Sequence, residues 1–435
     1  MNKHTALCLA LAAALVAPAQ AAGEDELRAR IDRLASELET LKNELNALKA
    51  RPEATAPAMS AAPPAAIQGA ASAAGTGVAG NTTLVGYGEI NMNAYRRDRT
   101  QNQVDIRRAV FGIAHQASAR TRIVSELEVE HAVTSADDAG EVAVEQLYVE
   151  HQLNDKIALK GGLFLIPMGF LNLVHEPTNY YGVERNFVET AIIPSTWREV
   201  GLSAFGVTEA GLRWDVGLTT GFDFSKWDAT EGRESPLGAI HQEGQNARSK
   251  NLSTYASLAW RGTPGLDIGG AVFTGKAGHG NKDEAPSRFA LLNNARLTLW
   301  DMHARWTPGR WDLAALYARG TISNTGDYNL ATTLDGVGNV IPRRFFGWYG
   351  QAAYHAWKSG EYALTPFVRH ERFNTAAAYS SLTTGLSLEP GRTERVWTVG
   401  ANLKVGGNVV LKADYQRFKE DRNMDRINLG LGYSF

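Results

Sequence analysis

The chain of 435 residues contains almost no cysteine. Its single cysteine, Cys8, lies inside an apolar N-terminal stretch that has the features of a signal peptide. Removal of that stretch leaves a mature chain without a thiol. Disulfide bonds, a cysteine nucleophile and thiolate metal ligands are therefore excluded, and we expect neither a metal nor a cofactor.

Long hydrophobic runs and an excess of positive charge are missing as well. After the N-terminus no run reaches the roughly 18 apolar residues of a membrane-spanning helix. The 44 Lys and Arg residues face 46 Asp and Glu residues, which argues against a nucleic-acid partner. The ten histidines are scattered, and neither HExxH nor GxSxG occurs, so we do not expect an enzyme.

The first residues resemble a secretory signal. Lys3 and His4 are followed by the apolar residues 6–17 and by an A-x-A site at residues 19–21. This order predicts a signal peptide over residues 1–21 that is cleaved after Ala21. Export without a helical anchor leaves the periplasm, secretion or an outer-membrane barrel as destinations.

Residues 22–50 carry a heptad pattern, and residues 51–80 are rich in Ala and Pro. The first segment predicts a short periplasmic coiled coil, with a trimer and a dimer both open; a single amphipathic helix packed on its own domain is the alternative. The second segment predicts a tether. The seam of the coiled coil consists of Leu27, Ile31, Leu34, Leu38, Leu41, Leu45 and Leu48.

Residues 81–435 have the pattern of an all-β domain. Apolar and polar residues alternate in segments that Gly, Pro, Asn and Asp interrupt, which is typical of strands. The connections alternate between tight joints, such as Ala119-Arg120, and long polar loops. Short turns on one rim and long loops on the other indicate a transmembrane antiparallel β-barrel of about sixteen strands, with 14 or 18 as alternatives. The predicted strands lie near 82–94, 105–118, 121–132, 142–153, 156–165, 197–206, 211–222, 251–262, 265–275, 291–306, 310–320, 345–357, 361–373, 394–404, 408–417 and 425–435.

A soluble β-sandwich or a propeller fits this region less well. A sandwich seldom needs sixteen strands, and a propeller would repeat a blade motif that the sequence lacks. Several aromatic residues near strand ends are candidates for the interfacial girdles of a membrane barrel. They are Tyr148, Trp260, Trp300, Trp306, Trp311, Trp357 and Tyr433.

Charged side chains alternate with apolar ones along several predicted strands. In 121–132, for example, Ile123 and Leu127 share one face, and three carboxylates share the other. Burying such charges in a dry core would be costly, so we expect them to face a water-filled lumen. The predicted pore-lining wall comprises Arg122, Glu126, Glu128, Glu130, Arg369, Lys404, Lys412 and Asp414.

The segment 166–196 is predicted to be the longest loop, and it is unusually apolar and aromatic. A loop of this length is normally functional, and its composition suggests that it folds inward against the barrel wall and narrows the lumen. Its ionisable residues, together with one just beyond it, are the candidate constriction: His175, Glu176, Glu184, Arg185, Glu189 and Arg198.

The C-terminal segment DRINLGLGYSF has one apolar face that ends in Tyr433 and Phe435. It resembles the closing strand of bacterial outer-membrane barrels, where it is the signal for the barrel-assembly machinery. GLFLIPMGF (162–170), YYGVERN (180–186) and LKADYQRF (411–418) are similar to segments of the phosphate-selective porin O/P-like family. The resemblance implies a homotrimeric porin in the bacterial outer membrane, surrounded by lipid.

The solute does not follow from the resemblance. Phosphate selectivity in that family is attributed to a ladder of Arg and to Lys near the constriction, but segment 166–196 has no Lys, and its acids outnumber its fixed bases. A basic stripe on the opposing wall, from residues such as Arg107, Arg108, Arg296 and Arg305, would offset the acids. Anion and cation preference both stay open.

Three functions remain. The first is passive diffusion of small hydrophilic solutes or ions, with anions such as phosphate included. The second is a structural barrel tethered toward peptidoglycan by its coiled coil. The third is a channel dedicated to one ligand, such as a siderophore.

Overall fold

The computed structural model describes residues 81–135, 138, 140–282, 288–382 and 385–435, together with Ser36, Thr76 and Gly77. The chain divides into two units, residues 1–62 and 63–435. The predicted signal peptide and nearly all of the coiled-coil and tether segments lie outside the described residues. They remain predictions.

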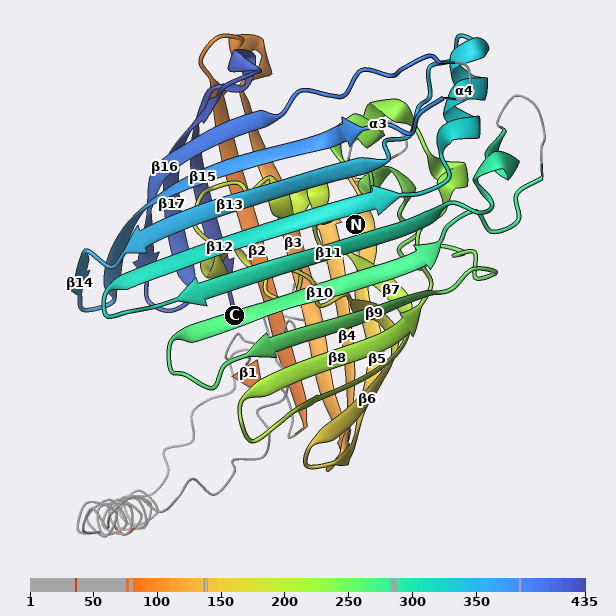
Figure 1. Ribbon diagram of the computed structural model, residues 1–435. Helices are drawn as coiled ribbons and strands as arrows, with labels where there is room; N and C mark the ends of the chain where they lie inside the picture. The colour runs from red at the N-terminus through yellow and green to blue at the C-terminus, as the bar shows by residue number, and fades with distance from the viewer. Residues whose placement is uncertain are drawn as a thin grey trace, which may run out of the picture. The chain divides into compact units, whose positions relative to one another are not determined.

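The second unit is a closed antiparallel barrel (Figure 1). The short strand β14 continues β13, and β1 (Thr76–Gly77) adds a two-residue pairing to β2, so sixteen strands form the wall. β18 pairs with β2, with Ser434 opposite Tyr87, and this pairing closes the ring. The wall strands are β2 (Thr82–Tyr95), β3 (Gln103–Ser118), β4 (Thr121–Glu130), β5 (Val142–Asn154), β6 (Ile157–Leu165), β7 (Arg198–Val207), β8 (Leu212–Thr219), β9 (Ser253–Trp260), β10 (Leu266–Lys276), β11 (Arg296–Trp306), β12 (Trp311–Ile322), β13 (Arg344–Tyr354) with β14 (Trp357–Ser359), β15 (Tyr362–Ala378), β16 (Glu394–Val405), β17 (Val409–Phe418) and β18 (Arg426–Ser434).

The prediction of a barrel of sixteen strands is confirmed, because each predicted strand overlaps one wall strand. The largest differences at strand ends are at the start of β11 and at the end of β15, which continues to Ala378 instead of residue 373. We expected β11 from residue 291, but Phe289–Leu292 forms a helical turn and the strand begins at Arg296.

The two rims of the barrel differ as expected. Short turns join β3 to β4 and β16 to β17, where Gly406 adopts a positive φ of 65°. The other rim carries the long loops and the helices α3 and α4 (Figure 1). The helical segments are η1 (Arg99–Gln101), η2 (Pro177–Asn179), η3 (Val188–Ile192), η4 (Phe224–Lys226), α3 (Ala229–Glu234), η5 (Gly238–Ile240), η6 (Phe289–Leu292), α4 (Gly326–Leu334) and η7 (Arg422–Met424).

The prediction that segment 166–196 is the longest loop is wrong. The β8–β9 loop spans 33 residues between Thr219 and Ser253, whereas the β6–β7 loop spans 32 residues between Leu165 and Arg198. We expected β8 to continue to residue 222. Instead Phe222 leaves the ladder and packs 5.1 Å from Trp197, measured between ring centroids.

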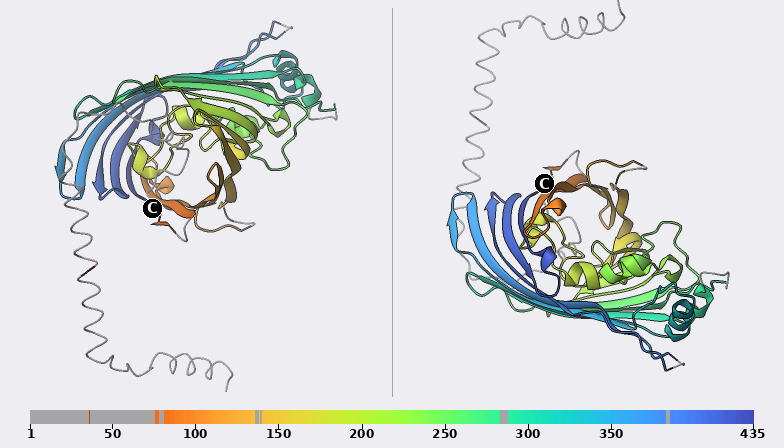
Figure 2. Two further views of the ribbon diagram at one scale, coloured as in Figure 1. Left: turned by 90° about the horizontal axis from the view of Figure 1, so that it is seen from below. Right: turned by 90° about the horizontal axis from the view of Figure 1, so that it is seen from above.

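Both of these loops lie inside the ring of strands (Figure 2). Ile192 and Trp197 of the β6–β7 loop and Phe224 of the β8–β9 loop belong to one buried apolar cluster with residues of β10–β13. The rings of Trp197 and Phe273 on β10 are 4.6 Å apart. The apolar composition of the β6–β7 loop is therefore explained by packing within the barrel rather than by contact with lipid.

The outer face of the barrel is apolar, as the alternation predicts for a wall in contact with lipid. Leu202, for example, is 71% exposed. Trp306, Trp311 and Trp357 are exposed near the short-turn rim, but Tyr148 is only 5% exposed and faces inward. Tyr148 is therefore not part of a girdle, because the pleat of β5 turns it into the lumen.

The end of the chain closes the wall. The backbone N–H of Phe435 donates to the carbonyl of Gly86 at 2.9 Å, and the N–H of Gly86 donates back at 3.0 Å. The ring of Tyr433 covers Gly88, where a side chain would collide with it. In the described part of the chain, no helix has the length and apolar character needed to cross a bilayer.

Candidate functional site

The middle of the β6–β7 loop is attached to the inner wall by hydrogen bonds from several strands. The Tyr180 hydroxyl donates to Glu89 on β2 at 2.6 Å. The Val183 backbone N–H donates to Asp414 on β17 at 2.6 Å, and Arg369 on β15 donates to the Tyr181 carbonyl at 3.0 Å. Two predicted pore-lining residues, Asp414 and Arg369, therefore point inward but hold the loop.

Lys412, another predicted wall residue, is also covered by this loop. Its Nζ lies 3.5 Å from the centroid of the Tyr180 ring, and the side chain is buried. A cation over an aromatic face is stabilised by the ring quadrupole. Lys412 consequently interacts with the loop rather than with the open lumen.

Glu189 organises the loop from within. Its carboxylate accepts hydrogen bonds from the backbone N–H groups of Phe170 at 2.6 Å and Leu171 at 2.7 Å. It also accepts from Asn186 at 2.8 Å and from the Tyr349 hydroxyl at 3.0 Å. Burial raises the pKa of Glu189, although these hydrogen bonds act in the opposite direction. The structure thus places this predicted constriction residue inside the packing of the loop.

His175 and Glu176 are buried near the start of the loop. His175 Nε2 lies 3.8 Å from Oε2 of Glu145 on β5, and Glu176 accepts a hydrogen bond from Asn179 at 2.7 Å. A β-bulge in β5, where the pairing shifts between Glu126 and Leu127, turns Glu145 inward. Strand alternation alone does not reveal Glu145, because it assumes an unbroken pleat.

The wall carboxylates of β4 converge on an arginine of β3. Arg108 lies 2.9 Å from Glu128, 3.3 Å from Glu130 and 3.5 Å from Glu89. Glu128 and Glu126 point inward as predicted but are buried, and Glu126 accepts a hydrogen bond from Gln146 at 2.5 Å. The expectation that they face open water is wrong for these two residues, because Arg108, Gln146 and the loops cover them.

Arg122, the remaining wall residue of β4, lies 3.3 Å from Glu150 across the β4–β5 pair. Arg296, considered for a basic stripe, is exposed and has the same strand parity as Met302 and Trp306 on the outer face of β11. It therefore cannot line the lumen.

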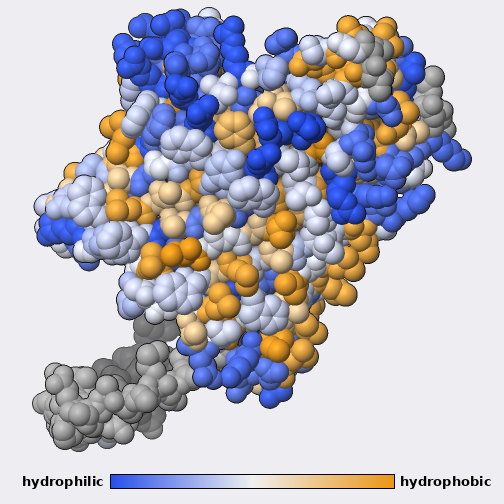
Figure 3. Space-filling view, in the orientation of Figure 1, coloured by the Kyte–Doolittle hydropathy of each residue, from blue (hydrophilic) through white to orange (hydrophobic). Residues whose placement is uncertain are grey.

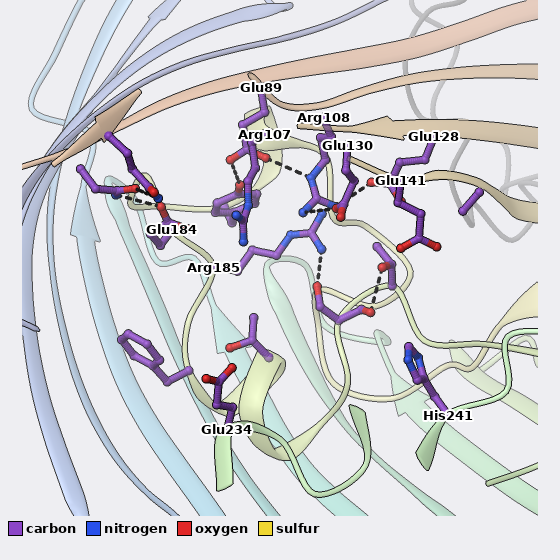
Figure 4. Close-up of a pocket in the computed structure, with 18 of the residues that line it drawn as sticks. Glu89, Arg107, Arg108, Glu128, Glu130, Glu141, Glu184, Arg185, Glu234 and His241 are labelled. Carbon is purple, nitrogen blue, oxygen red and sulfur yellow. Dashed lines mark hydrogen bonds and ion pairs between the residues drawn. The ribbon is translucent and has the colours of Figure 1, made fainter. Parts of the chain in front are cut away.

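A cavity of about 580 Å³ lies between the β2–β5 wall and the two inward loops (Figure 4). Arg185 extends across it toward the wall, and Glu234 and His241 of the β8–β9 loop lie opposite Glu130 and Glu141. Seven glutamates and five arginines line it: Glu89, Glu128, Glu130, Glu141, Glu184, Glu234, Glu243, Arg107, Arg108, Arg185, Arg198 and Arg426.

Some charged side chains of this cavity form ion pairs, whereas others form hydrogen bonds only with uncharged groups. Arg198 lies 3.2 Å from Glu243. The pKa of Glu243, which burial alone would raise, is held below its usual value by the hydrogen bond from His241 and the charge of Arg198. Glu184 accepts from Asn93 at 3.0 Å, and Arg185 donates to the His175 carbonyl at 3.2 Å and to Ser195.

Sequence reasoning did not find the contribution of the β8–β9 loop to this cavity. Glu234, His241 and Glu243 lie in a segment whose composition is ordinary for an exposed loop. The aromatic residues Phe222, Phe224 and Trp227 are the sequence feature that could have indicated an inward loop, because they bury it in the lumen.

A second cavity, of about 240 Å³, lies beside the aromatic residues of the β6–β7 loop and is lined by residues from the short-turn half of the wall. Arg261 lies 2.6 Å from Asp267, and Arg305 lies 2.5 Å from Asp312. Lys404, a predicted wall residue, has no carboxylate at ion-pair distance among the described residues. The two cavities thus differ in charge, with carboxylates in excess in the larger one and an unpaired cation in the smaller one.

Nothing in the described ranges resembles a metal centre, since no three His, Cys, Asp or Glu side chains there are grouped as ligands. The cavities hold charged and aromatic side chains that are suited to contact small polar solutes in water.

Comparison with known proteins agrees with the barrel architecture. Residues 78–429 match the family model of phosphate-selective porin O and P. An uncharacterized protein of Aquifex aeolicus (strain VF5) is 28% identical over 365 residues, which are 81% of this chain and 80% of that protein.

Solved structures of outer-membrane channels have the same fold. Salmonella typhi OmpF, in complex with daunomycin, has a TM-score of 0.55 at 14% identity and covers 82% of this chain and 98% of its own. The channel DcaP of Acinetobacter baumannii has a TM-score of 0.52 at 10% identity, with 83% and 99% covered. An anion-selective porin from Comamonas acidovorans has a TM-score of 0.50 at 10% identity, with 81% and 99% covered.

Proposed function

The chain belongs to the phosphate-selective porin O and P family and is an outer-membrane porin, and on this premise we propose that it passes small hydrophilic solutes and ions by passive diffusion through a lumen narrowed by two inward loops. The attachment of the β6–β7 loop to β2, β15 and β17 is the observation that carries the proposal. A loop anchored to so many strands stays in the lumen and limits the size of the solute.

The proposed ion preference is weak. Carboxylates are in excess in the larger cavity and oppose anions, whereas Lys404 in the smaller cavity opposes cations. An ion that crosses the barrel meets both cavities in turn, so neither sign is strongly excluded. Phosphate is accordingly one permeant anion among others in this proposal.

The proposal is tested by shortening the loop. Replacement of residues 177–187 by a short Gly-Ser link should raise the single-channel conductance in planar bilayers several-fold, because Tyr180 and Tyr181 leave the lumen. A link in the β4–β5 loop that replaces residues 132–140 and keeps Glu141 should leave the conductance unchanged. Unchanged conductance of the first variant, with its barrel shown to be folded by circular dichroism, would contradict the proposal.

Further expectations from the sequence belong to the same proposal. We propose cleavage after Ala21, a homotrimer, recognition of the strand ending in Tyr433 and Phe435 by the barrel-assembly machinery, and a periplasmic coiled coil over residues 22–50 that reaches toward peptidoglycan. Crosslinking of the mature protein in whole cells would test the trimer.

A further inference from the structure

A row of cations lies on the outer face of half of the barrel, toward the long-loop rim. Each of seven neighbouring strands from β10 to β17, apart from the short β14, contributes one residue. The pairing places Lys276 opposite Arg296 and Arg372 opposite Arg395. We call the set the cation row: Lys276, Arg296, Arg319, Arg344, Arg372, Arg395 and Arg417.

The strand pleat shows that the row faces outward. Arg395 has the same parity as Trp397 and Val399, which are exposed apolar residues of β16. Arg417 has the parity of the exposed Leu411 on β17. In Figure 3, hydrophilic residues gather toward the long-loop end of the wall and hydrophobic residues are more frequent below them.

The row lacks counter-charges. The structure describes these seven strands completely, and their outward faces contain no Asp or Glu. On the inner face of β15, by contrast, Arg369 lies 2.9 Å from Glu371. Arg319, Arg344, Arg372, Arg395 and Arg417 form no ion pair with any carboxylate of the described ranges.

The pair of Arg372 and Arg395 is the strongest evidence for an external anion. Directly opposite residues of antiparallel strands have Cβ atoms about 4.5–5.5 Å apart, and like charges there are destabilising. An anion placed between the two guanidinium groups would remove this repulsion.

Aromatic side chains lie next to the row on the membrane side. The ring of His370 stacks on Trp397 with centroids 4.3 Å apart, and the ring of Trp348 meets His370 edge-on at 5.4 Å. Tyr317 and Tyr415 lie two residues from Arg319 and Arg417 on the same faces. Trp and Tyr mark the headgroup level of a membrane, so the row lies at the headgroups of the outer leaflet.

The other half of the barrel is different. Toward the long-loop rim, strands β2–β9 expose Met92, Val104, Val142, Val200 and Leu218. Among the strands, outward cations toward this rim are therefore concentrated on β10–β17, and the exposed Arg96 just after β2 lies next to them, 5.9 Å from the centroid of the Tyr415 ring.

We propose that the cation row binds the phosphate groups of the phosphorylated glycolipid of the outer leaflet. Guanidinium groups match phosphate oxygens in bidentate geometry, and a row along neighbouring strands suits headgroups that lie side by side around a barrel. The outward position favours a lipid over a free anion, because a solute there would not be enclosed. This inference depends on the outer-membrane location of the barrel and not on how the pore selects solutes.

The experiment uses the folded mature protein in detergent. Diphosphorylated lipid A is titrated, with dephosphorylated lipid A of the same acyl chains in parallel, and bound lipid is counted by native mass spectrometry. The variant R372Q/R395Q/R417Q should bind the phosphorylated lipid at least about tenfold more weakly, because each cation near an anionic lipid surface strengthens binding. The control variant R120Q/R310Q/K358Q, altered at the short-turn rim, should bind as the wild type does.

Three results would overturn the inference. They are equal weakening in both variants, equal affinity for the dephosphorylated lipid, and displacement of the lipid by equimolar inorganic phosphate. If the triple variant does not fold, R372Q and R395Q are tested singly against the same two lipids. The triple variant should keep wild-type conductance, so failure of the pore proposal and failure of the lipid proposal are distinguishable.

Discussion

His175 Nε2 lies 3.8 Å from Oε2 of Glu145, and the two side chains are 2% and 0% exposed. Neither carboxylate oxygen of Glu145 has a hydrogen-bond partner among the described residues. Among the described residues, the histidine is the only basic side chain within 4 Å of this buried carboxylate. The contact joins the start of the β6–β7 loop to β5.

Removal of one member of this pair should destabilise the protein strongly. H175A leaves Glu145 buried without a partner, and loss of one partner from a buried pair costs about 3–5 kcal/mol of unfolding free energy. The double variant E145Q/H175A should recover part of that loss in urea unfolding. H151A, at an exposed histidine of β5, is the control and should have little effect. Additive effects of E145Q and H175A would show that the two residues are not coupled.

Neutralising carboxylates of the larger cavity should favour anions. In E184Q/E234Q the chloride-to-potassium permeability ratio should rise roughly twofold, since a screened charge near a water-filled pore is worth about 0.5 kcal/mol. The ratio is obtained from the reversal potential across a potassium chloride gradient. E209Q, at an exposed turn, is the control. A shift toward cations would refute the proposed role of these residues.

Neutralising Lys404 should change the chloride-to-potassium permeability ratio in the opposite direction. K404Q removes the unpaired cation of the smaller cavity, so the same permeability ratio should fall roughly twofold. K358Q has the same charge change on the exposed strand β14 and should not alter the ratio. Identical ratios for K404Q and the wild type would mean that ions do not pass close to Lys404.

Stability should depend on pH through Glu189. Because its pKa in the folded protein lies above the ordinary 4.5, the folded state binds more protons than the unfolded state between these two values. The unfolding free energy should therefore fall as the pH rises from about 4.5 through the raised pKa, by at most about 1.4 kcal/mol per pH unit. Urea unfolding curves recorded across the pH range should show that the unfolding free energy of E189Q lacks this fall with rising pH.

Glu243 should contribute a pH dependence of the unfolding free energy that is opposite to that of Glu189. Its pKa is lowered, so its stabilising contribution is present above the ordinary value of 4.5 and is lost as the pH falls through the lowered pKa. E243Q should therefore reduce stability at neutral pH and have less effect in acid. The same pH trend for E189Q and E243Q would contradict the assignment of the two loop carboxylates.

Much of the wall was predictable because strand alternation is a local property. Ile123 and Leu127 face outward and Glu126 and Glu128 face inward, as the two-residue period requires. The bulge at Glu145 was not predictable, because it arises from the pairing of β5 with β4. From the sequence alone, Glu189 of the β6–β7 loop is a candidate pore-lining residue. Its hydrogen-bond partners Phe170 and Tyr349 come from other parts of the chain and bury it.

The sequence by itself determined the closed barrel of sixteen strands, its two unequal rims and its family. Lipid outside and a polar interior impose the same alternation on every strand, so these features can be read from neighbouring residues. The tertiary structure decided which inward charges remain accessible. Asp414 and Val183 are 231 residues apart and yet hydrogen-bonded, and Arg372 and Arg395 become opposite only when β15 pairs with β16. Such contacts depend on the register and closure of the whole barrel, which no local pattern specifies.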